Sequence, residues 1–308
     1  MTKEITTITI ATRESPLALW QAKFTADLIE KTFPYIKTKL LPMTTRGDKI
    51  LNVTLDKIGG KGLFLKELEQ AMLAREADIA VHSMKDVPAA MPDEFTICSI
   101  FTRHDASDAF VSNTYKSIDE LSYNAVVGTS SLRRQSQLLS LRPDLQVKAL
   151  RGNVQTRLKK LDNGEYDAII LATAGLERMK MDDRIAAKMY PPNWLPAVGQ
   201  GAVGVECLST RTDLIELFSQ LNDKNTAQCI CAERAMNKEL EGSCSSAIGA
   251  SAIFDGDTIK MQALVAHPDG SKIIRVEDES NDPVFLGKNI AQALFAKGAQ
   301  EILDLAHD

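Results

Sequence analysis

Short polar residues and arginines gather at three places where a β-like segment gives way to a helical one. These places are 12–15, 128–131 followed by Arg133 and Arg134, and 151–153 with Arg157 one turn further on. Backbone N–H groups at a helix start, hydroxyls beside them and a nearby guanidinium group together suit a carboxylate or a phosphate. Because serine and threonine cap many helices, one such junction means little. Three of them predict an anion-binding site.

A fourth polar run, 82–86, follows the apolar segment 79–81. This run is interpreted as a functional loop because of Asp86. Asp86 lies beside Lys85, so it can stay ionised at neutral pH and stabilise a cation. The alternative is an ordinary polar loop in which His82 is held by a hydrogen bond.

Cys244 lies in a short loop of glycine and polar residues, 241–246. An exposed thiolate in such a loop can act as a nucleophile, whereas most lone cysteines are passive small apolar residues. The other four cysteines, at 98, 207, 229 and 231, form no CxxC pair, which argues against a disulfide framework and a structural zinc site. The four histidines are widely separated, so no metal site is expected.

Strands and helices must alternate to position these residues. The first half predicts a strand within the alternating run 5–12, a helix capped by Ser15 with Pro16 at its first position, a helix over 64–75, and strands at 79–81 and 95–101. The rhythm repeats with strands at 125–127, 146–150 and 167–172 and helices at 131–141 and 154–161. Alternation of this kind predicts largely parallel sheets with ligand sites at the carboxyl ends of the strands.

The pattern changes after residue 222. A helix is expected over 226–240, then three β-like segments at 247–254, 258–265 and 272–277, and a long amphipathic helix at 285–305. Turn signals separate the three segments, which indicates a small α+β domain with an antiparallel sheet.

Composition excludes several classes of protein. The chain has 308 residues, of which 44% are hydrophobic and 25% charged, as in ordinary globular proteins. Its net charge of −5 argues against a nucleic-acid binder, although 128–160 holds eight basic residues and one acid. No apolar run approaches the length of a membrane span. The N-terminal segment resembles neither a secretory signal nor a transit peptide, so we expect a cytoplasmic protein.

One motif is misleading. Residues 199–204 match the GxGxxG pattern of dinucleotide-binding proteins, which requires a preceding strand and a following helix. Here Pro196 precedes the motif and a β-like segment follows it. We therefore expect no nucleotide site.

Nearly the whole chain resembles the porphobilinogen deaminase family. The resemblance rests on motifs in a fixed order, among them ATRESPLALWQA at 11–22, GGKGLFLKELE at 59–69, VHSMKDVP at 81–88, GTSSLRRQSQL at 128–138, LRGNVQTRLKKL at 150–161, LPAVGQGAVGVE at 195–206 and ERAMNKELEGSC at 233–244. It implies a transferase that joins four porphobilinogen molecules head to tail, with loss of ammonia, to give the linear tetrapyrrole hydroxymethylbilane of haem biosynthesis. It also implies a dipyrromethane cofactor attached to Cys244 through a thioether. The loop departs from the family pattern at Ser243 and Ala247, where glycine and proline are usual.

The resemblance assigns roles to particular residues. Asp86 and Lys85 are implied as catalytic. Cofactor binding falls to Cys244, Ser83, Lys85, Asp86, Thr129, Ser130, Ser131, Arg133 and Arg134, and substrate binding to Arg13, Ser15, Gln21, Phe64, Arg151, Arg157 and Gln200. Two cofactor rings and four substrate rings carry twelve carboxylates, which accounts for the many cations.

The implied fold has two α/β lobes, like those of periplasmic binding proteins, around a cleft and a small C-terminal α+β domain with a three-stranded antiparallel sheet. The expected domains are 1–101 with 202–221, 105–196, and 224–308. A monomer is expected, with porphobilinogen as the small-molecule partner and neither nucleic acid nor membrane. Two alternatives stay open: a two-lobed carboxylate-binding protein without activity, and an inactive relative with a scaffolding role.

Overall fold

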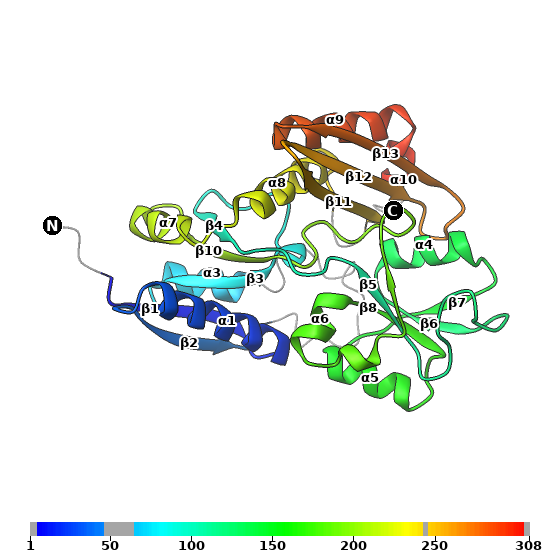
Figure 1. Cartoon of the computed structure of the whole chain (residues 1–308), viewed down its shortest axis with the longest axis horizontal. Helices are drawn as coiled ribbons and strands as arrows, with labels where there is room; N and C mark the ends of the chain where they lie inside the picture. Colours follow the sequence, from blue (N-terminus) through cyan, green and yellow to red (C-terminus); the bar gives the residue numbers. More distant parts are fainter. Residues whose placement is uncertain (1–4, 46–64, 243–245, 305–308) are drawn as a thin grey trace. The chain divides into compact units, whose positions relative to one another are not determined.

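The computed structural model describes residues 5–45, 65–242 and 246–304, and the chain divides into two compact units. Among the described residues, the first unit comprises 5–45, 65–103 and 202–227, and the second comprises 104–201 together with the residues from 228 on. Figure 1 gives the course of the chain. The finer division into three domains stays a prediction.

The first unit is built on a five-stranded sheet in the order β2-β1-β3-β10-β4. Its strands are β1 (Thr7–Arg13), β2 (Lys37–Met43), β3 (Ile79–Ser83), β4 (Phe95–Ile100) and β10 (Val203–Leu208). Strand β1 runs parallel to β2 and β3, whereas β10 runs antiparallel to β3 and β4. Strand β4 therefore points the same way as β1, β2 and β3, and the sheet is largely parallel, as expected, with β10 as its one antiparallel strand among the described residues.

Helices α1 (Pro16–Thr32), α3 (Lys66–Leu73) and α7 (Thr212–Ser219) complete this unit, with a 3₁₀ turn η2 (Met84–Asp86) after β3. As predicted, Ser15 caps α1: its Oγ accepts a hydrogen bond from the Ala18 amide, and Pro16 occupies the first turn. Ile29 of α1 packs into a core with apolar side chains of β1, β3, β10 and α7. The helix therefore begins where β1 ends, at the edge that carries the first polar junction.

The second unit contains another mixed five-stranded sheet, in the order β7-β6-β8-β5-β9. Its strands are β5 (Asp108–Val111), β6 (Val126–Gly128), β7 (Gln146–Lys148), β8 (Ala168–Ala172) and β9 (Ala187–Met189). Strand β6 is parallel to β7 and β8, and β5 is antiparallel to β8 and β9. Because β5 runs the other way, its first residue lies at the edge where β8 ends.

Helices cover both faces of this second sheet. They are α4 (Leu132–Leu141), α5 (Val154–Asp162) and α6 (Thr173–Arg178), with a 3₁₀ turn η3 (Asp182–Arg184). Leu138 of α4 packs with Phe110 and Ile170, whereas Leu158 of α5 packs with Ile169. Alternate residues along β8 thus serve opposite cores, as the period of two in a strand requires.

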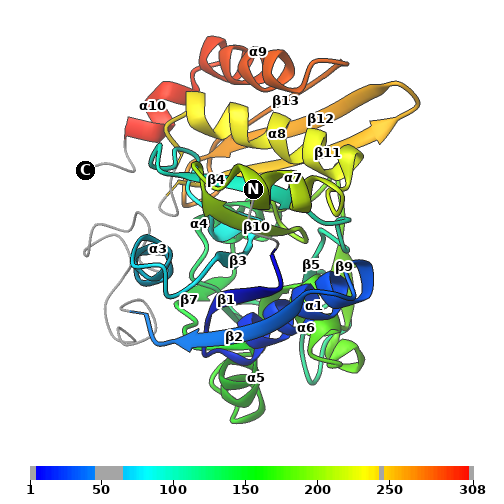
Figure 2. The ribbon, with the colours of Figure 1, turned by 90° about the vertical axis from the view of Figure 1, so that its left-hand side faces the viewer.

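The C-terminal part of the second unit is a three-stranded antiparallel sheet with helices on one face (Figure 1, Figure 2). It contains β11 (Ile248–Asp255), β12 (Thr258–Ala266), β13 (Ile273–Ser280), α9 (Pro283–Ala296), α10 (Ala299–Asp304) and, from residue 228 on, α8 (Lys224–Glu239), whose first turn belongs to the first unit. On the opposite face, Leu264 and Ala266 pack with Leu195 and Ala247. This contact fixes the sheet to the segment that precedes β10.

The C-terminal helix predicted over 285–305 is two helices. Helix α9 ends before Lys297, and Gly298 has a φ of +90°, a conformation that favours glycine and stops an α-helix. The apolar periodicity continues past this break, because Leu294 of α9 and Ile302 of α10 contribute to the same core. Periodicity alone therefore concealed the end of the helix.

Candidate functional site

In the first unit, polar side chains gather where the parallel strands β1 and β3 end. Arg13 closes β1 and is partly exposed, and Ser15 is engaged in capping α1. Gln21, on the next turn of α1, is buried and donates a hydrogen bond from Nε2 to the Ser83 Oγ at 2.7 Å. The structure therefore brings together Gln21 and Ser83, two residues from distant motifs.

The residues after β3 form the turn η2, in which Asp86 and part of Lys85 face solvent and Met84 faces the interior. Asp86 is exposed and Lys85 is partly exposed, whereas Met84 is 1% exposed and packs against Gly204. The Met84 amide donates a hydrogen bond to the Ala202 carbonyl at 3.0 Å. This anchoring holds Asp86 at the surface of the sheet edge, where a carboxylate can meet a ligand.

His82 and Glu206 form a buried pair directly before this turn. The distance between His82 Nε2 and Glu206 Oε2 is 2.8 Å, and the two side chains are 5% and 0% exposed. They lie diagonally across β3 and β10, because Gly204 is the residue directly opposite His82. The interpretation of His82 as a hydrogen-bonded structural histidine is confirmed.

Breaking this pair is expected to destabilise the protein strongly. His82→Leu leaves Glu206 buried without its hydrogen-bond partner, which typically costs about 1–3 kcal/mol of the free energy of unfolding or more. The double variant His82→Leu/Glu206→Leu should lose less than His82→Leu alone, because no unpaired polar side chain is left buried. Urea denaturation of the three proteins measures the difference.

The control is Arg211→Gln, which removes ion pairs that Arg211 makes with Asp78 and Asp213 in the same unit. The Arg211 side chain is 33% exposed, so its loss should cost less than about 1 kcal/mol. If His82→Leu costs no more than Arg211→Gln, the buried pair does not hold β3 to β10.

In the second unit, two predicted junctions are joined by a side chain. Ser130 follows β6, and its Oγ both donates to the Leu150 carbonyl and accepts from the Leu150 amide, each at 3.0 Å. Thr129 is buried, and its Oγ1 accepts from the Ser131 amide at 3.2 Å. The junction after β6 and the loop that holds Arg151 are therefore adjacent, as neighbouring parallel strands require.

Arg151 and Arg157 lie on this second loop and helix. Arg157 Nε donates to the Gly152 carbonyl at 2.7 Å, and both arginines are partly exposed. Among the described residues, no hydrogen bond or ion pair involves the Arg151 guanidinium group. Arg151 is thus available to an external anion.

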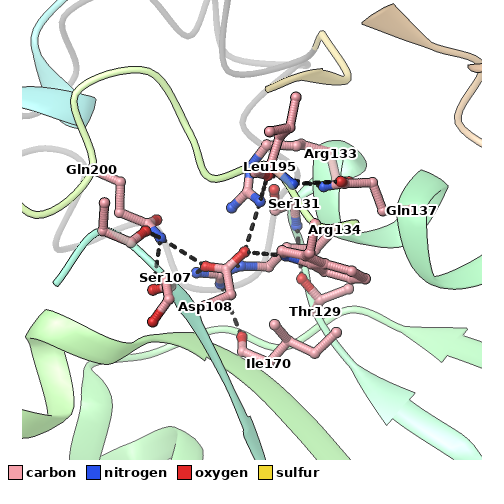
Figure 3. A network of polar contacts seen from close by, with 12 residues as sticks. Ser107, Asp108, Thr129, Ser131, Arg133, Arg134, Gln137, Ile170, Leu195 and Gln200 are labelled. Atoms are coloured by element: carbon pink, nitrogen blue, oxygen red, sulfur yellow. Dashed lines mark hydrogen bonds and ion pairs between the residues drawn. The ribbon is translucent and has the colours of Figure 1, made fainter. Parts of the chain in front are cut away.

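Arg133 and Arg134, in the first turn of α4, point inward and share one carboxylate (Figure 3). Arg133 Nη1 lies 2.6 Å from Asp108 Oδ2, and Arg134 donates to Asp108 Oδ1 from Nη2 at 2.7 Å and from Nε at 3.1 Å. Arg134 Nη1 also donates to the Ile170 carbonyl at 2.9 Å. Both arginines are nearly buried, so their guanidinium groups do not lie on the exposed surface of α4.

The cluster of Arg133, Arg134 and Asp108 has two positive side chains and one negative side chain. Burial by itself would raise the pKa of Asp108, but the charges and hydrogen bonds of Arg133 and Arg134 hold it far below its usual range. Burial lowers the pKa of Arg133, while the charge of Asp108 opposes that change. Two guanidinium groups face one carboxylate, so the cluster attracts a further anion.

Gln200 also joins this cluster. Its Nε2 donates to Asp108 Oδ1 at 2.9 Å and lies within hydrogen-bonding distance of the Ala106 and Ser107 carbonyls. Gln200 belongs to the GxGxxG-like segment, in which Gly199 and Gly201 have positive φ and β10 follows. A Cβ on Gly201 would lie 2.6 Å from the His104 carbonyl oxygen. Loop packing, rather than a nucleotide, accounts for these glycines.

Sequence reasoning missed Asp108, Trp194 and Glu206. The sequence pointed to Asp108 only indirectly. Two adjacent arginines at the start of an amphipathic helix need a carboxylate partner if one of them is buried. Nothing in the sequence placed that partner 25 residues upstream. Cys244 and Phe64, both predicted site residues, lie outside the described residues.

The residues present fit a ligand that carries several carboxylates. Arg133 uses only Nη1 for hydrogen bonds among the described residues, to Asp108 and to the Leu195 carbonyl at 2.7 Å, which leaves donors on Nε and Nη2. No helix of the described segments is long and apolar enough to cross a membrane. The same segments hold no group of three or more potential metal ligands.

The fold and these clusters define an α/β protein that gathers arginines and hydroxyls where its strands end. Comparison with known proteins makes this specific. The model of the porphobilinogen deaminase dipyrromethane cofactor-binding domain matches residues 8–216, and that of the C-terminal domain matches residues 227–296. The chain belongs to the porphobilinogen deaminase family, transferases that make hydroxymethylbilane in tetrapyrrole biosynthesis.

Full-length relatives agree. Porphobilinogen deaminases of Stenotrophomonas maltophilia strains K279a and R551-3 are each 52% identical over 301 residues, which cover 97% of this chain and 99% of theirs. Among solved structures, a putative methionine-binding lipoprotein of Bacillus subtilis is 13% identical with a TM-score of 0.44, over 72% of this chain and 92% of its own. The predicted family is confirmed by the sequence relatives.

Proposed function

We propose that arginines and hydroxyls near the ends of the strands bind the carboxylates of a growing pyrrole chain, and that Asp86 stabilises the cation formed from each incoming porphobilinogen. The observation that carries this proposal is the buried group of Arg133, Arg134 and Asp108, in which two guanidinium groups share one carboxylate. A site built for a neutral ligand would have no reason to bury a surplus positive charge.

The dipyrromethane cofactor of the family fits this charge pattern. Cys244 would hold it by a thioether, and Arg133 and Arg134, with Thr129, Ser130 and Ser131, would bind its carboxylates. When bound, the cofactor supplies the pyrrole α-carbon at which the first carbon–carbon bond is made. The protein's part is to orient that carbon with charge-assisted hydrogen bonds, each contributing about 1.5–3 kcal/mol.

Substrate carboxylates need further cations. Each porphobilinogen carries an acetate and a propionate. Arg13 closes β1, Arg151 follows β7 and Arg157 lies on α5, and all three are partly exposed. Ser15, Gln21, Phe64 and Gln200 complete the proposed substrate site. Ser15 would bind through the part of its hydroxyl that the cap of α1 leaves open, and the Gln21–Ser83 hydrogen bond would orient the neighbouring groups.

The proposed chemical step begins when the bond between the aminomethyl carbon and nitrogen breaks. Ammonia leaves with the electron pair, and an azafulvenium cation forms on the substrate. The α-carbon of an acceptor pyrrole then attacks the methylene carbon, and the acceptor carbon loses its proton. Asp86, exposed at the end of β3 beside Lys85, would stabilise the cation electrostatically, and Lys85 would bind a carboxylate.

We also propose that the protein works as a monomer in the cytoplasm, with porphobilinogen as its partner and without nucleic acid or membrane. The net charge of −5 supports the part of this proposal that concerns nucleic acid, because a polyanion is repelled by a negatively charged protein.

A product assay separates the proposed function from its alternatives. Purified protein is mixed with porphobilinogen, the product is oxidised, and the absorbance of porphyrin is recorded. Porphyrin that accumulates in proportion to the protein added is the expected result. Saturable binding of porphobilinogen without porphyrin would instead support a carboxylate-binding protein, and neither binding nor product would support a scaffolding role.

A further inference from the structure

Asp108 receives more hydrogen bonds than its two arginines alone account for (Figure 3). Besides Arg133 and Arg134, Trp194 donates to Oδ2 from Nε1 at 2.7 Å, and Gln200 donates to Oδ1 at 2.9 Å. The side chain of Asp108 is 0% exposed. Five N–H groups from three segments thus converge on one carboxylate.

This convergence fixes the direction of Arg133. The contact with Asp108 and the bond to the Leu195 carbonyl both use Nη1, and Leu195 is itself held at both backbone atoms by Gln137. One edge of the Arg133 guanidinium is therefore tied inward, and the donors on Nε and Nη2 are left without a partner among the described residues. Arg134, in contrast, uses all three of its nitrogens.

The charge of Asp108 works against the binding of anions, yet the structure retains it. A site that needed only positive potential would gain from two arginines without a buried acid between them. The presence of Asp108 is explained if direction matters more than charge, because a guanidinium group binds a carboxylate well only in a planar, aligned geometry.

We propose that Asp108 is a positioning residue that aims the free edge of Arg133 at a carboxylate of the cofactor. The inference rests on the proposed function, in which Arg133 and Arg134 bind the dipyrromethane carried by Cys244. It assigns Asp108 no contact with the cofactor. It predicts that the geometry imposed by Asp108, and not the sum of charges around it, sets the rate at which the cofactor is acquired.

The test uses full-length apo-protein incubated with porphobilinogen, with intact-protein mass spectrometry to follow the gain of two pyrrole units. Asp108→Asn makes the cluster more positive but replaces one of the two acceptor oxygens by an N–H donor, and Asp108→Glu keeps the charge but displaces it by one methylene. We expect both variants to acquire the cofactor at least tenfold more slowly than wild type. Asp144→Asn is the matched control, because Asp144 also pairs with an arginine, Arg142, in the same unit. It should load at the wild-type rate.

The outcomes are distinct. Loading by Asp108→Asn at or above the wild-type rate would overturn the inference and show that charge alone matters. Should Asp108→Asn fail to fold, as judged by circular dichroism, Asp108→Glu decides in the same way, with wild-type loading as the contradicting result. A wild-type protein that never gains the adduct would instead refute the proposed function.

Discussion

Replacement of Cys244 by serine is expected to abolish both covalent modification and product formation. The thioether requires a sulfur nucleophile, and a serine hydroxyl is a much poorer nucleophile at neutral pH. Intact-protein mass spectrometry should show the wild-type polypeptide with two linked pyrrole units and Cys244→Ser without them. The loss should be complete rather than partial, because the protein would have no attachment point for the growing chain.

The other cysteines provide the control. Burial raises the pKa of the Cys231 thiol, and a hydrogen bond with Cys207 together with burial raises that of Cys98, so both stay protonated at neutral pH. Cys231→Ser should therefore load the cofactor normally. An adduct that persists in Cys244→Ser, or one that disappears in Cys231→Ser, would contradict the assignment.

Asp86→Asn is expected to lower the rate of product formation by about 10²–10³, or roughly 3–4 kcal/mol of transition-state stabilisation. Asparagine keeps the size of the side chain and one hydrogen-bond acceptor but removes the charge opposite the azafulvenium cation. The folded state and the Cys244 adduct should both survive, because Asp86 is exposed and makes no hydrogen bond or ion pair among the described residues. Steady-state assays with the loaded variant measure the effect.

The matched control is Asp93→Asn, which removes another exposed carboxylate from the first unit. Asp93→Asn should keep full activity. The loss in Asp86→Asn would then come from the position of Asp86 and not from a general loss of negative charge at the surface. If Asp86→Asn keeps more than about a tenth of wild-type activity, cation stabilisation must be assigned to a different group.

Much of the fold was predictable because local signals agreed with the tertiary structure. The cap at Ser15 and the proline after it marked the start of α1, and turn signals between β-like segments located β11, β12 and β13. What local signals do not contain is strand direction. The antiparallel insertion of β10 beside β3, and of β5 beside β8, depends on contacts between segments far apart in the sequence.

The candidate site was predictable to a different degree. The motifs indicated which cations and hydroxyls to expect, because helix starts and arginines are visible in the sequence. They did not indicate that Arg133 and Arg134 are buried around Asp108, since that depends on the direction of β5 and on the fold of the segment around Trp194. Nor did they indicate that the hydroxyl of Ser130, which stays a predicted cofactor-binding group, also joins two neighbouring loops through Leu150.

We expect porphobilinogen units to be joined one at a time on a chain that stays covalently attached to Cys244. The experiment is rapid mixing of the loaded enzyme with limiting porphobilinogen, followed by intact-protein mass spectrometry. Species heavier than the loaded enzyme by one to four pyrrole units should appear and return to the starting mass as hydroxymethylbilane is released. Product formation by a protein whose mass never changes would contradict this expectation.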